Sequence, residues 1–427
     1  MNGSGLPLRL ACTEGVPEHG FIGAAVRLGA MSAAEVRESI RSTSDRLRGL
    51  LRIKNALSVT GETLLVRDCA GLIRIAPGLE LEVAPKFLGA NEPSWREDFF
   101  LIASVVRTGA ILPRERLRAE SADRGDLASL VGRAMVTMYE DNHRRPLRTY
   151  HRKTWHEFAA DGEPDPEDLI LPDPDGFRQE GIFLDRENRY NATIRDAARR
   201  LLPEIRNPAT RVQLTRVVEA LSPQGAPRNS PRPRVVPSRH RRWQQIYDIS
   251  LQVLEGLGLG LRPDLLHSPG YVLRTWFAWE ELLSRALQLG LGEHHVKAKV
   301  SYPLGVRSGK RIVVTPDVSY RRDATVLIDA KYRARRKDAR TRIARADAYE
   351  VLAFMQAAGA KRTVLLYPRV ARAEVTNDPP GSCRRFEKIQ VGEAQILGLE
   401  VECRGIAASG FHMFAETLTQ SVEPFLG

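Results

Sequence analysis

The sequence predicts an α+β protein of several domains: a small β-rich N-terminal domain, a helical middle region and a C-terminal domain that mixes strands and helices. Short runs with apolar residues at every second position dominate residues 63–83, which is typical of strands. Apolar residues recur at three- and four-residue spacing from 95 to 221, which is typical of helices. After residue 243 the expected order is helix, three strands, helix and strand, which implies a mixed sheet with helices against its faces.

The N-terminal domain is expected to span residues 1–94. Its clearest strands are Thr63–Arg67, Gly71–Ile75 and Leu79–Val83. In the third run the apolar residues alternate with glutamates, so we expect one buried face and one solvent-exposed face. A chain of 427 residues has room for roughly two or three such domains, each with its own core.

Residues 95–221 are expected to form a helical region that is followed by a linker. The predicted helices are Phe99–Thr108, Leu127–Tyr139, Asn191–Ile205 and Thr210–Leu221. Residues 222–242 are rich in proline and arginine and poor in apolar side chains. Because proline at this density prevents a regular helix, we interpret them as a linker.

Residues 243–427 are interpreted as the C-terminal domain. Its predicted helices are Tyr271–Leu289 and Ile343–Ala358, and its predicted strands are Val296–Tyr302, Arg311–Tyr320, Thr325–Tyr332 and Thr363–Tyr367. Any site in this domain is therefore expected on a mixed sheet. Along the chain, one helix precedes the strands of this sheet and a second helix lies between the third and the fourth strand.

The charge composition favours a negatively charged partner such as nucleic acid. The chain has 64 Lys and Arg against 52 Asp and Glu, a formal net charge of +12. Ten basic and three acidic residues fall between Arg321 and Arg345, and such a concentrated basic run is typical of phosphate-backbone binding. No run of about 18 uncharged apolar residues is present, so a membrane-spanning helix is excluded and we expect a cytoplasmic protein.

Two acidic residues stand inside runs that otherwise favour strands, where carboxylates are uncommon. Asp317 follows a proline, and Asp329 begins an Asp-x-Lys triplet. If the two strands form a hairpin centred on residue 323, Asp317 directly faces Asp329, roughly 5 Å apart at Cβ. Lys331 lies two residues beyond Asp329 and therefore points to the same side of the sheet.

This arrangement favours a metal site. Two carboxylates so close repel each other unless they share a cation, and Mg²⁺ prefers oxygen ligands while leaving positions open for water and phosphate. Lys331 would orient or help deprotonate a water and offset charge that builds up on phosphorus. A third acid is expected from the helix before the strands, either Glu280 or Glu281. The alternative interpretation is an ordinary salt bridge on a surface hairpin.

The helix glutamate, the Pro-Asp pair, the Asp-x-Lys triplet and the following helix resemble the PD-(D/E)xK nuclease superfamily, whose core has the order αβββαβ. Residues 70–86, which end in Pro85-Lys86, resemble the N-terminal signature of the McrC family, the nuclease component of McrBC-type, modification-dependent restriction systems. Residues 187–198 are similar to the middle helical region of that family, and residues 346–354 to the helix after its catalytic strand.

The resemblance implies a role for each residue of the predicted site. Asp317 and Asp329 would bind Mg²⁺, with Mn²⁺ as an alternative ion and the Ala330 carbonyl as an added ligand. Lys331 would be the catalytic lysine and Glu280 the helix acid.

The helix after the catalytic strand leaves one position of the site open. The family often has glutamine where this chain has Glu350, and the chain has Gln356 further along the same helix. Either Glu350 or Gln356 is therefore expected to complete the site.

The resemblance also implies partners. Residues 1–94 would dock onto a McrB-like AAA+ GTPase or ATPase hexamer and stimulate its hydrolysis, and that partner would recognise modified double-stranded DNA. Contacts with the DNA backbone are expected from the basic residues after the Asp-x-Lys triplet, namely Arg333, Arg335, Arg336, Lys337 and Arg340.

The expected function is therefore a Mg²⁺-dependent DNA endonuclease subunit of a restriction or antiviral system, driven by an AAA+ partner. Two alternatives stay open. The chain would act as a non-cleaving regulator of the motor if its nuclease chemistry were dispensable. It would act alone, as a RecB-like repair nuclease, if cleavage needed no partner.

Overall fold

The computed structural model shows a mixed α+β protein. It describes residues 8–28, 31–76, 79–108, 127–159, 161–171, 173–221, 235–254, 271–322, 324–333, 335–337, 340–370 and 378–426. Contacts divide the chain into two compact units: unit 1 contains residues 1–131 and 255–427, and unit 2 contains residues 132–254. The first part of the chain and its last part thus share one unit, and the predicted domain boundaries stay predictions.

The N-terminal part of unit 1 is built around a four-stranded sheet. Strand β1 (Leu8–Thr13) runs parallel to β5 (Leu79–Ala84), and β4 (Cys69–Ala76) is antiparallel to β5. The edge beyond β4 is occupied by β9 (Tyr271–Arg274), from nearly 200 residues later in the chain. The prediction that Tyr271 begins a helix was therefore wrong, because the helix starts only at Thr275.

The expected solvent-exposed face of β5 was also wrong, since every residue of the strand is buried. Its two glutamates are neutralised by arginines. Arg9 Nε lies 2.7 Å from the Glu80 carboxylate, and Arg96 Nε lies 2.8 Å from the Glu82 carboxylate. The alternation of glutamates and apolar residues in β5 therefore indicates buried ion pairs and not an exposed face. A buried carboxylate is tolerated when an arginine compensates its charge.

The C-terminal part of unit 1 contains a six-stranded mixed sheet in the order β10-β13-β14-β17-β19-β18. These strands are β10 (Val296–Ala298), β13 (Val318–Arg321), β14 (Thr325–Ala330), β17 (Arg362–Pro368), β18 (Cys383–Val391) and β19 (Ala394–Val401). The predicted strand Arg311–Tyr320 is two strands. Its first half is β12 (Lys310–Val314), which pairs with β11 (Tyr302–Arg307) in a separate hairpin, and Pro316 interrupts the chain before β13.

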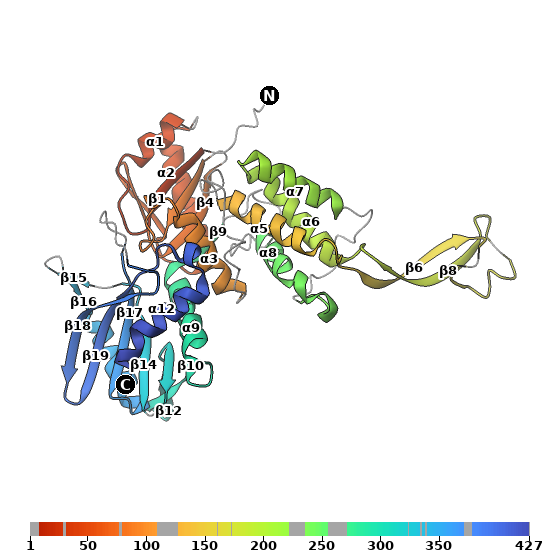
Figure 1. Cartoon of the computed structure of the whole chain (residues 1–427). Helices are drawn as coiled ribbons and strands as arrows, with labels where there is room; N and C mark the ends of the chain where they lie inside the picture. Colours follow the sequence, from red (N-terminus) through yellow and green to blue (C-terminus); the bar gives the residue numbers. More distant parts are fainter. Residues whose placement is uncertain are drawn as a thin grey trace. The chain divides into compact units, whose positions relative to one another are not determined.

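Helices cover this sheet (Figure 1). Helix α10 (Arg345–Ala358) packs its Val351 and Phe354 on the side formed by Leu327 of β14 and its neighbours. Helix α9 (Thr275–Leu291) also contacts β14 and packs along α12 (Phe411–Val422). The two helices predicted in this domain are thus present as α9 and α10. The strand predicted at 363–367 is confirmed as part of β17.

The helices predicted in the middle of the chain are confirmed. They are α3 (Trp95–Thr108), α5 (Leu127–Asn142), α6 (Arg189–Leu201) and α7 (Pro208–Ala220). Asn188 and Asn207 cap α6 and α7 by accepting a hydrogen bond from a backbone N–H, each at 3.0 Å. In unit 2, α8 (Gln244–Leu254) packs against α6.

Residues 149–185 of unit 2 form a long β hairpin, which the helical prediction for this region missed. Strands β6 (Thr149–Glu157) and β8 (Phe177–Asp185) pair along their whole length, and the short β7 (Glu163–Pro164) joins β8. We call residues 149–185 the arm, because the hairpin extends away from α6 and α8 (Figure 1).

The predicted linker at 222–242 is only partly described. Residues 222–234 lie outside the described residues. Val236 is buried, and a short 3₁₀ helix covers Ser238–Trp243, so the end of this segment is packed within unit 2. Nowhere in the described part of the chain does a helix have both the length and the apolar composition needed to cross a bilayer.

Candidate functional site

Three neighbouring strands bring Lys299, Asp317 and Asp329 side by side. Strand β13 pairs with β14 so that Val318 faces Ile328, and this register places Asp317 opposite Asp329, as the sequence predicted. Strand β10 pairs with β13 so that Ala298 faces Val318, which places Lys299 opposite Asp317. The Asp317 N–H donates to Asp329 Oδ1 at 3.2 Å, and the Ala330 N–H donates to Asp317 Oδ2 at 2.8 Å.

Helix α9 supplies the third carboxylate, and the structure favours Glu280 over Glu281. The Lys299 ammonium contacts the Glu280 carboxylate and lies 2.6 Å from Asp317 Oδ1, so it bridges the helix to the strand. Glu281 instead pairs with Arg285 on the same helix, at 3.5 Å. We call Glu280, Asp317 and Asp329 the carboxylate cluster.

Lys331 lies on the other side of Asp329. Its Nζ is 2.7 Å from Asp329 Oδ2 and 2.6 Å from a carboxylate oxygen of Glu350 on α10. Gln356, the other residue that the sequence left open, is exposed on the same helix. The structure therefore joins Glu350, and not Gln356, to the cluster through Lys331.

Sequence reasoning missed Lys299. This residue directly follows β10 and has a left-handed backbone (φ 54°), which only a few per cent of non-glycine residues adopt. Its N–H donates to the Asp317 carbonyl at 2.9 Å, so the backbone as well as the ammonium is held against that residue. The signal was the pairing of residues 296–298 with β13, which places residue 299 opposite residue 317.

The environment of the cluster shifts two protonation equilibria. Burial, together with the nearby Asp317 carboxylate, raises the pKa of Asp329 to about 6. Burial alone would lower the pKa of Lys331, but Asp329 and Glu350 outweigh it, so the pKa of Lys331 is raised. Lys331 is consequently a cation at neutral pH, which suits it to offset negative charge more than to accept a proton.

We expect Asp329→Asn to stabilise the metal-free protein at neutral pH. The pKa of Asp329 rises from 3.8 to about 6 on folding, so the unfolded chain loses this proton first and stability falls as pH rises through that window. The shift in pKa corresponds to a loss of about 3 kcal/mol in the free energy of unfolding, and this loss is complete above pH 6. The difference in unfolding free energy between Asp329→Asn and wild type, measured in EDTA, should grow by up to that amount between pH 4 and 7.

The control for this measurement is Asp175→Asn, which removes an exposed carboxylate of the arm. Its stability relative to wild type should change little over the same pH range. A difference for Asp329→Asn that stays constant from pH 4 to 7 would contradict the raised pKa.

The cluster fits a hard divalent cation. Its donors are carboxylate oxygens, which Mg²⁺ prefers, and a cation already lies among them, since the Lys299 ammonium contacts both Glu280 and Asp317. Asp317 and Asp329 each also accept a hydrogen bond from a backbone N–H of the opposite strand, which fixes their orientation. The Ala330 carbonyl stays a predicted ligand.

The basic residues predicted to contact DNA follow the cluster directly. Arg333 is largely exposed and pairs with Asp68. The backbone of the next residues forms a small hairpin of β15 (Arg335–Lys337) and β16 (Arg340–Arg342). The side chains of Arg335, Arg336, Lys337 and Arg340 lie outside the described residues.

Unit 2 carries a second basic surface, near the base of the arm. A hollow of about 400 Å³ is lined by Arg145, Pro146, Arg148, Leu184, Arg239, His240 and Arg242. No described carboxylate pairs with these arginines, whereas Arg239 and His240 both contact the Arg148 carbonyl. The hollow is thus positively charged and open to an anion.

Two further groups of potential metal ligands lie on or beside the arm. They are His151, Asp185 and Glu187, and His156, Asp173 and Asp175. The Lys153 ammonium lies 3.0 Å from Asp185 and 3.3 Å from Glu187, so an internal cation already neutralises the first group. All three residues of the second group are exposed. Within the first group the Glu187 N–H also donates to Asp185 Oδ1 at 2.8 Å.

Residues 179–368 match the protein family described as "McrBC 5-methylcytosine restriction system component". The matched range contains the whole carboxylate cluster together with Lys299, Lys331 and Glu350. No curated protein matches the chain.

The chain resembles solved structures, among them chains of two assemblies from Thermococcus gammatolerans. One is a chain of the refined half-complex of a tetradecameric assembly of Thermococcus gammatolerans McrB AAA+ hexamers with bound McrC, with a TM-score of 0.68, 14% identity, and coverage of 97% of this chain and 100% of that chain. The other belongs to the cryo-EM structure of the Thermococcus gammatolerans McrBC complex, with a TM-score of 0.48, 13% identity, and coverage of 66% and 87%. At these identities the first likeness establishes a shared fold.

Proposed function

Because residues 179–368 match the McrBC family, we propose that this chain is the nuclease subunit of a McrBC-like restriction system. In this role it hydrolyses phosphodiester bonds of double-stranded DNA, with Mg²⁺ as cofactor, when an AAA+ NTPase partner activates it. The observation that carries the proposal is the in-register alignment of Asp317 and Asp329, with Glu280 and Lys331 beside them. The family description suggests DNA that contains 5-methylcytosine as the substrate.

The residues of the cluster divide the work of hydrolysis. Glu280, Asp317 and Asp329 would hold Mg²⁺, which when bound lowers the pKa of a water and stabilises charge on the phosphate. Lys331, kept protonated by Asp329 and Glu350, would place a positive charge beside the phosphate that is attacked. Glu350 would keep Lys331 oriented while Asp329 serves as a metal ligand.

Basic residues in two parts of the chain support DNA as the substrate. A run of arginines and lysines in the sequence directly follows the cluster, and the arginine-lined hollow lies in unit 2. Arginine contacts with backbone phosphates position a duplex without reading its sequence. Such contacts are what a nuclease needs if its partner recognises the modified base.

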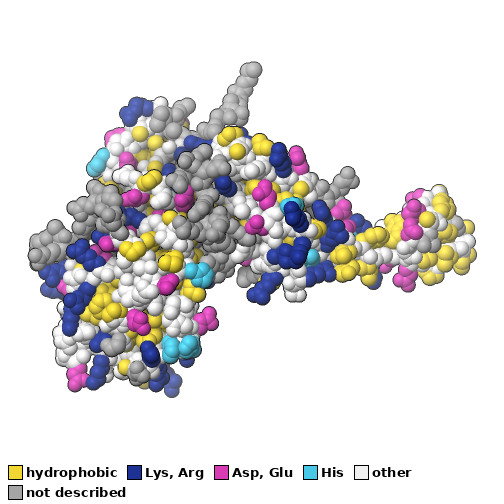
Figure 2. Space-filling model, viewed as in Figure 1, with side chains coloured by type: hydrophobic (Ala, Val, Ile, Leu, Met, Phe, Trp, Pro, Cys, Tyr) yellow, Lys and Arg dark blue, Asp and Glu magenta, His cyan; other side chains and the backbone are white. Residues whose placement is uncertain are grey.

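The arm is the surface that best suits the AAA+ partner. Its described residues expose large apolar side chains, namely Tyr150, Phe158, Leu169, Ile170, Leu171, Ile182, Phe183 and Leu184. Figure 2 shows patches of hydrophobic side chains on the arm. Exposed apolar patches of this kind mark protein interaction sites. The described part of residues 1–94 exposes only Val16 among its large apolar side chains, so we place the docking surface on the arm.

The test of the proposed function is cleavage of methylated and unmethylated plasmid DNA in Mg²⁺, with and without the McrB-like NTPase of the same organism and its nucleotide. Cleavage that needs the partner and nucleotide supports a restriction nuclease. Cleavage by the isolated chain would indicate a solitary nuclease. Accelerated nucleotide hydrolysis without any cleavage would indicate a regulator of the motor.

We expect Lys299→Met to bind Ca²⁺ or Mg²⁺ about 3- to 10-fold more tightly than wild type. A divalent ion entering the cluster has to displace the Lys299 ammonium from Glu280 and Asp317, and a half-exposed ion pair of this kind contributes on the order of 1 kcal/mol. Titration calorimetry with Ca²⁺ measures the affinity directly. Lys297→Met, which removes an exposed lysine two residues earlier, controls for the change in net charge. Equal affinities of the two variants would show that Lys299 does not compete with the metal.

A further inference from the structure

Tyr332, the residue directly after Lys331, is buried among residues of the N-terminal part of unit 1. Its ring meets Phe87 edge to face at 6.2 Å between centroids, and the Lys86 ammonium lies 3.7 Å above the ring centroid. The Lys86 ammonium also donates to the Tyr332 carbonyl. One lysine thus contacts both the side chain and the backbone of the residue that follows Lys331.

Glu14 connects Tyr332 to the helix that carries Glu280. This carboxylate directly follows β1, is only 3% exposed, and accepts a hydrogen bond from the Tyr332 hydroxyl. It also accepts one from Thr275 Oγ1 at 2.7 Å, and Thr275 is the first residue of α9. A buried carboxylate is tolerated only when donors satisfy it, so these contacts resist opening.

A second series of contacts links the N-terminal part of unit 1 to α9 and to the backbone of Lys331. Phe87 packs on Trp279 of α9 at 5.7 Å between ring centroids, and Trp279 lies next to Glu280 in the sequence. The indole N–H of Trp279 donates to the Leu366 carbonyl at 3.1 Å, and the Lys331 N–H donates to the same carbonyl at 2.9 Å. The backbone of Lys331 and the position of α9 are therefore set together.

We propose that Glu14, Lys86 and Tyr332 form a clamp that positions Lys331 and Glu280 in the carboxylate cluster. The proposal rests on the proposed function, because it concerns the geometry of that same site. It gives Glu14 and Lys86, which belong to the N-terminal part of unit 1, a positioning role at the proposed site. It also gives Lys86, the last residue of the 70–86 signature, a role at the site although Lys86 does not belong to the carboxylate cluster.

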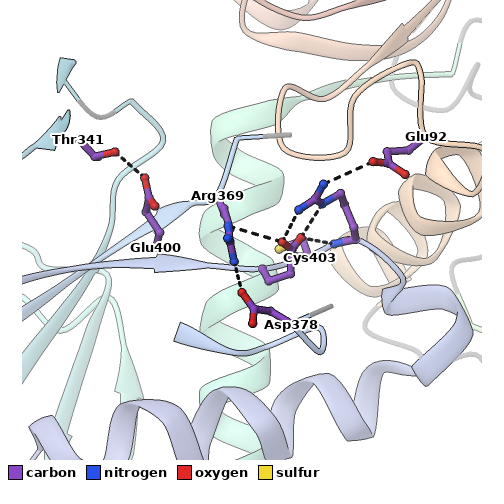
Figure 3. Close-up of polar contacts among 8 residues, drawn as sticks. Glu92, Thr341, Arg369, Asp378, Glu400 and Cys403 are labelled. Atoms are coloured by element: carbon purple, nitrogen blue, oxygen red, sulfur yellow. Dashed lines mark hydrogen bonds and ion pairs between the residues drawn. The ribbon is translucent and has the colours of Figure 1, made fainter. Parts of the chain in front are cut away.

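A second junction within unit 1 joins the same two parts of the chain but lies apart from these contacts. Arg404 bridges Glu92 at 3.4 Å and the buried Glu402 at 2.7 Å, while Arg369 contacts Asp378 beside it (Figure 3). No described contact of this junction reaches Lys331 or Glu280. It therefore supplies a matched control: Glu92→Gln weakens the junction without touching the clamp.

The test compares Tyr332→Phe, Lys86→Met, Lys86→Arg and Glu92→Gln in the full chain assembled with its NTPase partner. Single-turnover DNA cleavage and stimulated nucleotide hydrolysis are measured for each variant. Hydrogen exchange of residues 325–333 is measured on the isolated chain without metal or DNA. We expect Tyr332→Phe and Lys86→Met to lower the cleavage rate about 10- to 100-fold, since a misplacement of about 1 Å costs that much. The KM for DNA and the stimulated hydrolysis should not change.

Two comparisons separate positioning from general destabilisation. Lys86→Arg keeps a cationic donor for the Tyr332 carbonyl, so it should recover most of the rate that Lys86→Met loses. Glu92→Gln should cleave like wild type and leave exchange at 325–333 unchanged, whereas both clamp variants should speed exchange there. Wild-type rates and exchange in Tyr332→Phe and Lys86→Met would overturn the clamp, as would an equal loss of cleavage in Glu92→Gln.

The two proposals fail in distinguishable ways. If the wild-type complex does not cleave DNA at all, the proposed function is lost, and hydrogen exchange still decides whether the clamp holds the strand. Faster exchange at 325–333 in both clamp variants then supports the clamp, and unchanged exchange overturns it.

Discussion

Lys331→Ala is expected to lower DNA cleavage roughly 10³-fold, while the stimulated nucleotide hydrolysis of the partner stays at the wild-type level. The variant removes the cation that lies 2.7 Å from Asp329 and 2.6 Å from Glu350, so no charge offsets the phosphate as it is attacked. Cleavage is measured on methylated plasmid in the assembled complex, and hydrolysis is measured in the same samples.

Two comparisons make this result specific. Asp329→Ala, which removes a proposed metal ligand, should show the same loss of cleavage with the same intact hydrolysis. Lys297→Ala removes an exposed lysine of β10 and should cleave normally. Cleavage retained by purified Lys331→Ala or Asp329→Ala would remove the nuclease assignment. Loss of hydrolysis together with cleavage would show that the substitutions damage the assembly.

The second large effect is expected from the arm. Replacing Ile170 and Leu171 with aspartate should weaken partner binding by about 30-fold or more, because a single buried apolar anchor at an interface contributes about 2 kcal/mol, which corresponds to about 30-fold in affinity. Both side chains are more than four-fifths exposed in the chain alone, at 86% and 82%, so the change should not disturb folding. Binding is measured by titration of the NTPase, with stimulated hydrolysis as the second readout.

Val212→Asp is the matched control for the arm. Val212 is an exposed apolar residue of α7 in the same unit, at 53% exposure, and its substitution should leave binding unchanged. Wild-type binding by the Ile170→Asp, Leu171→Asp double variant would move the docking surface away from the arm. That result would return the N-terminal residues 1–94 to consideration as the contact with the partner.

The alignment of Asp317 with Asp329 could be predicted because it depends on local rules. A short connection joins the two strands, side chains alternate with a period of two, and the acids are equidistant from the turn. The same rules place Lys331 beside Asp329. Helices α6 and α7 were predictable for a similar reason, since their apolar spacing lies within the helices themselves.

The arm and β9 were missed because their signals are not local. The residues of β6 alternate between half-buried and exposed, but most of the half-buried ones are polar, so the strand carries no alternation of apolar side chains. Strand β9 joins a sheet whose other strands lie nearly 200 residues earlier. The four residues Tyr271–Arg274 contain no pattern that indicates pairing with a strand so distant in the sequence.

The sequence by itself determined the pair of acids, the lysine beside them and the order of elements that carries them. Only the tertiary structure decided between Glu280 and Glu281, because adjacent helix residues point about 100° apart and only the packing of α9 selects one. It also decided for Glu350 over Gln356 and revealed Lys299 and the contacts of Glu14 and Lys86 with Tyr332. These choices depend on which elements meet in space, and side-chain pairing across such contacts has no fixed spacing along the chain.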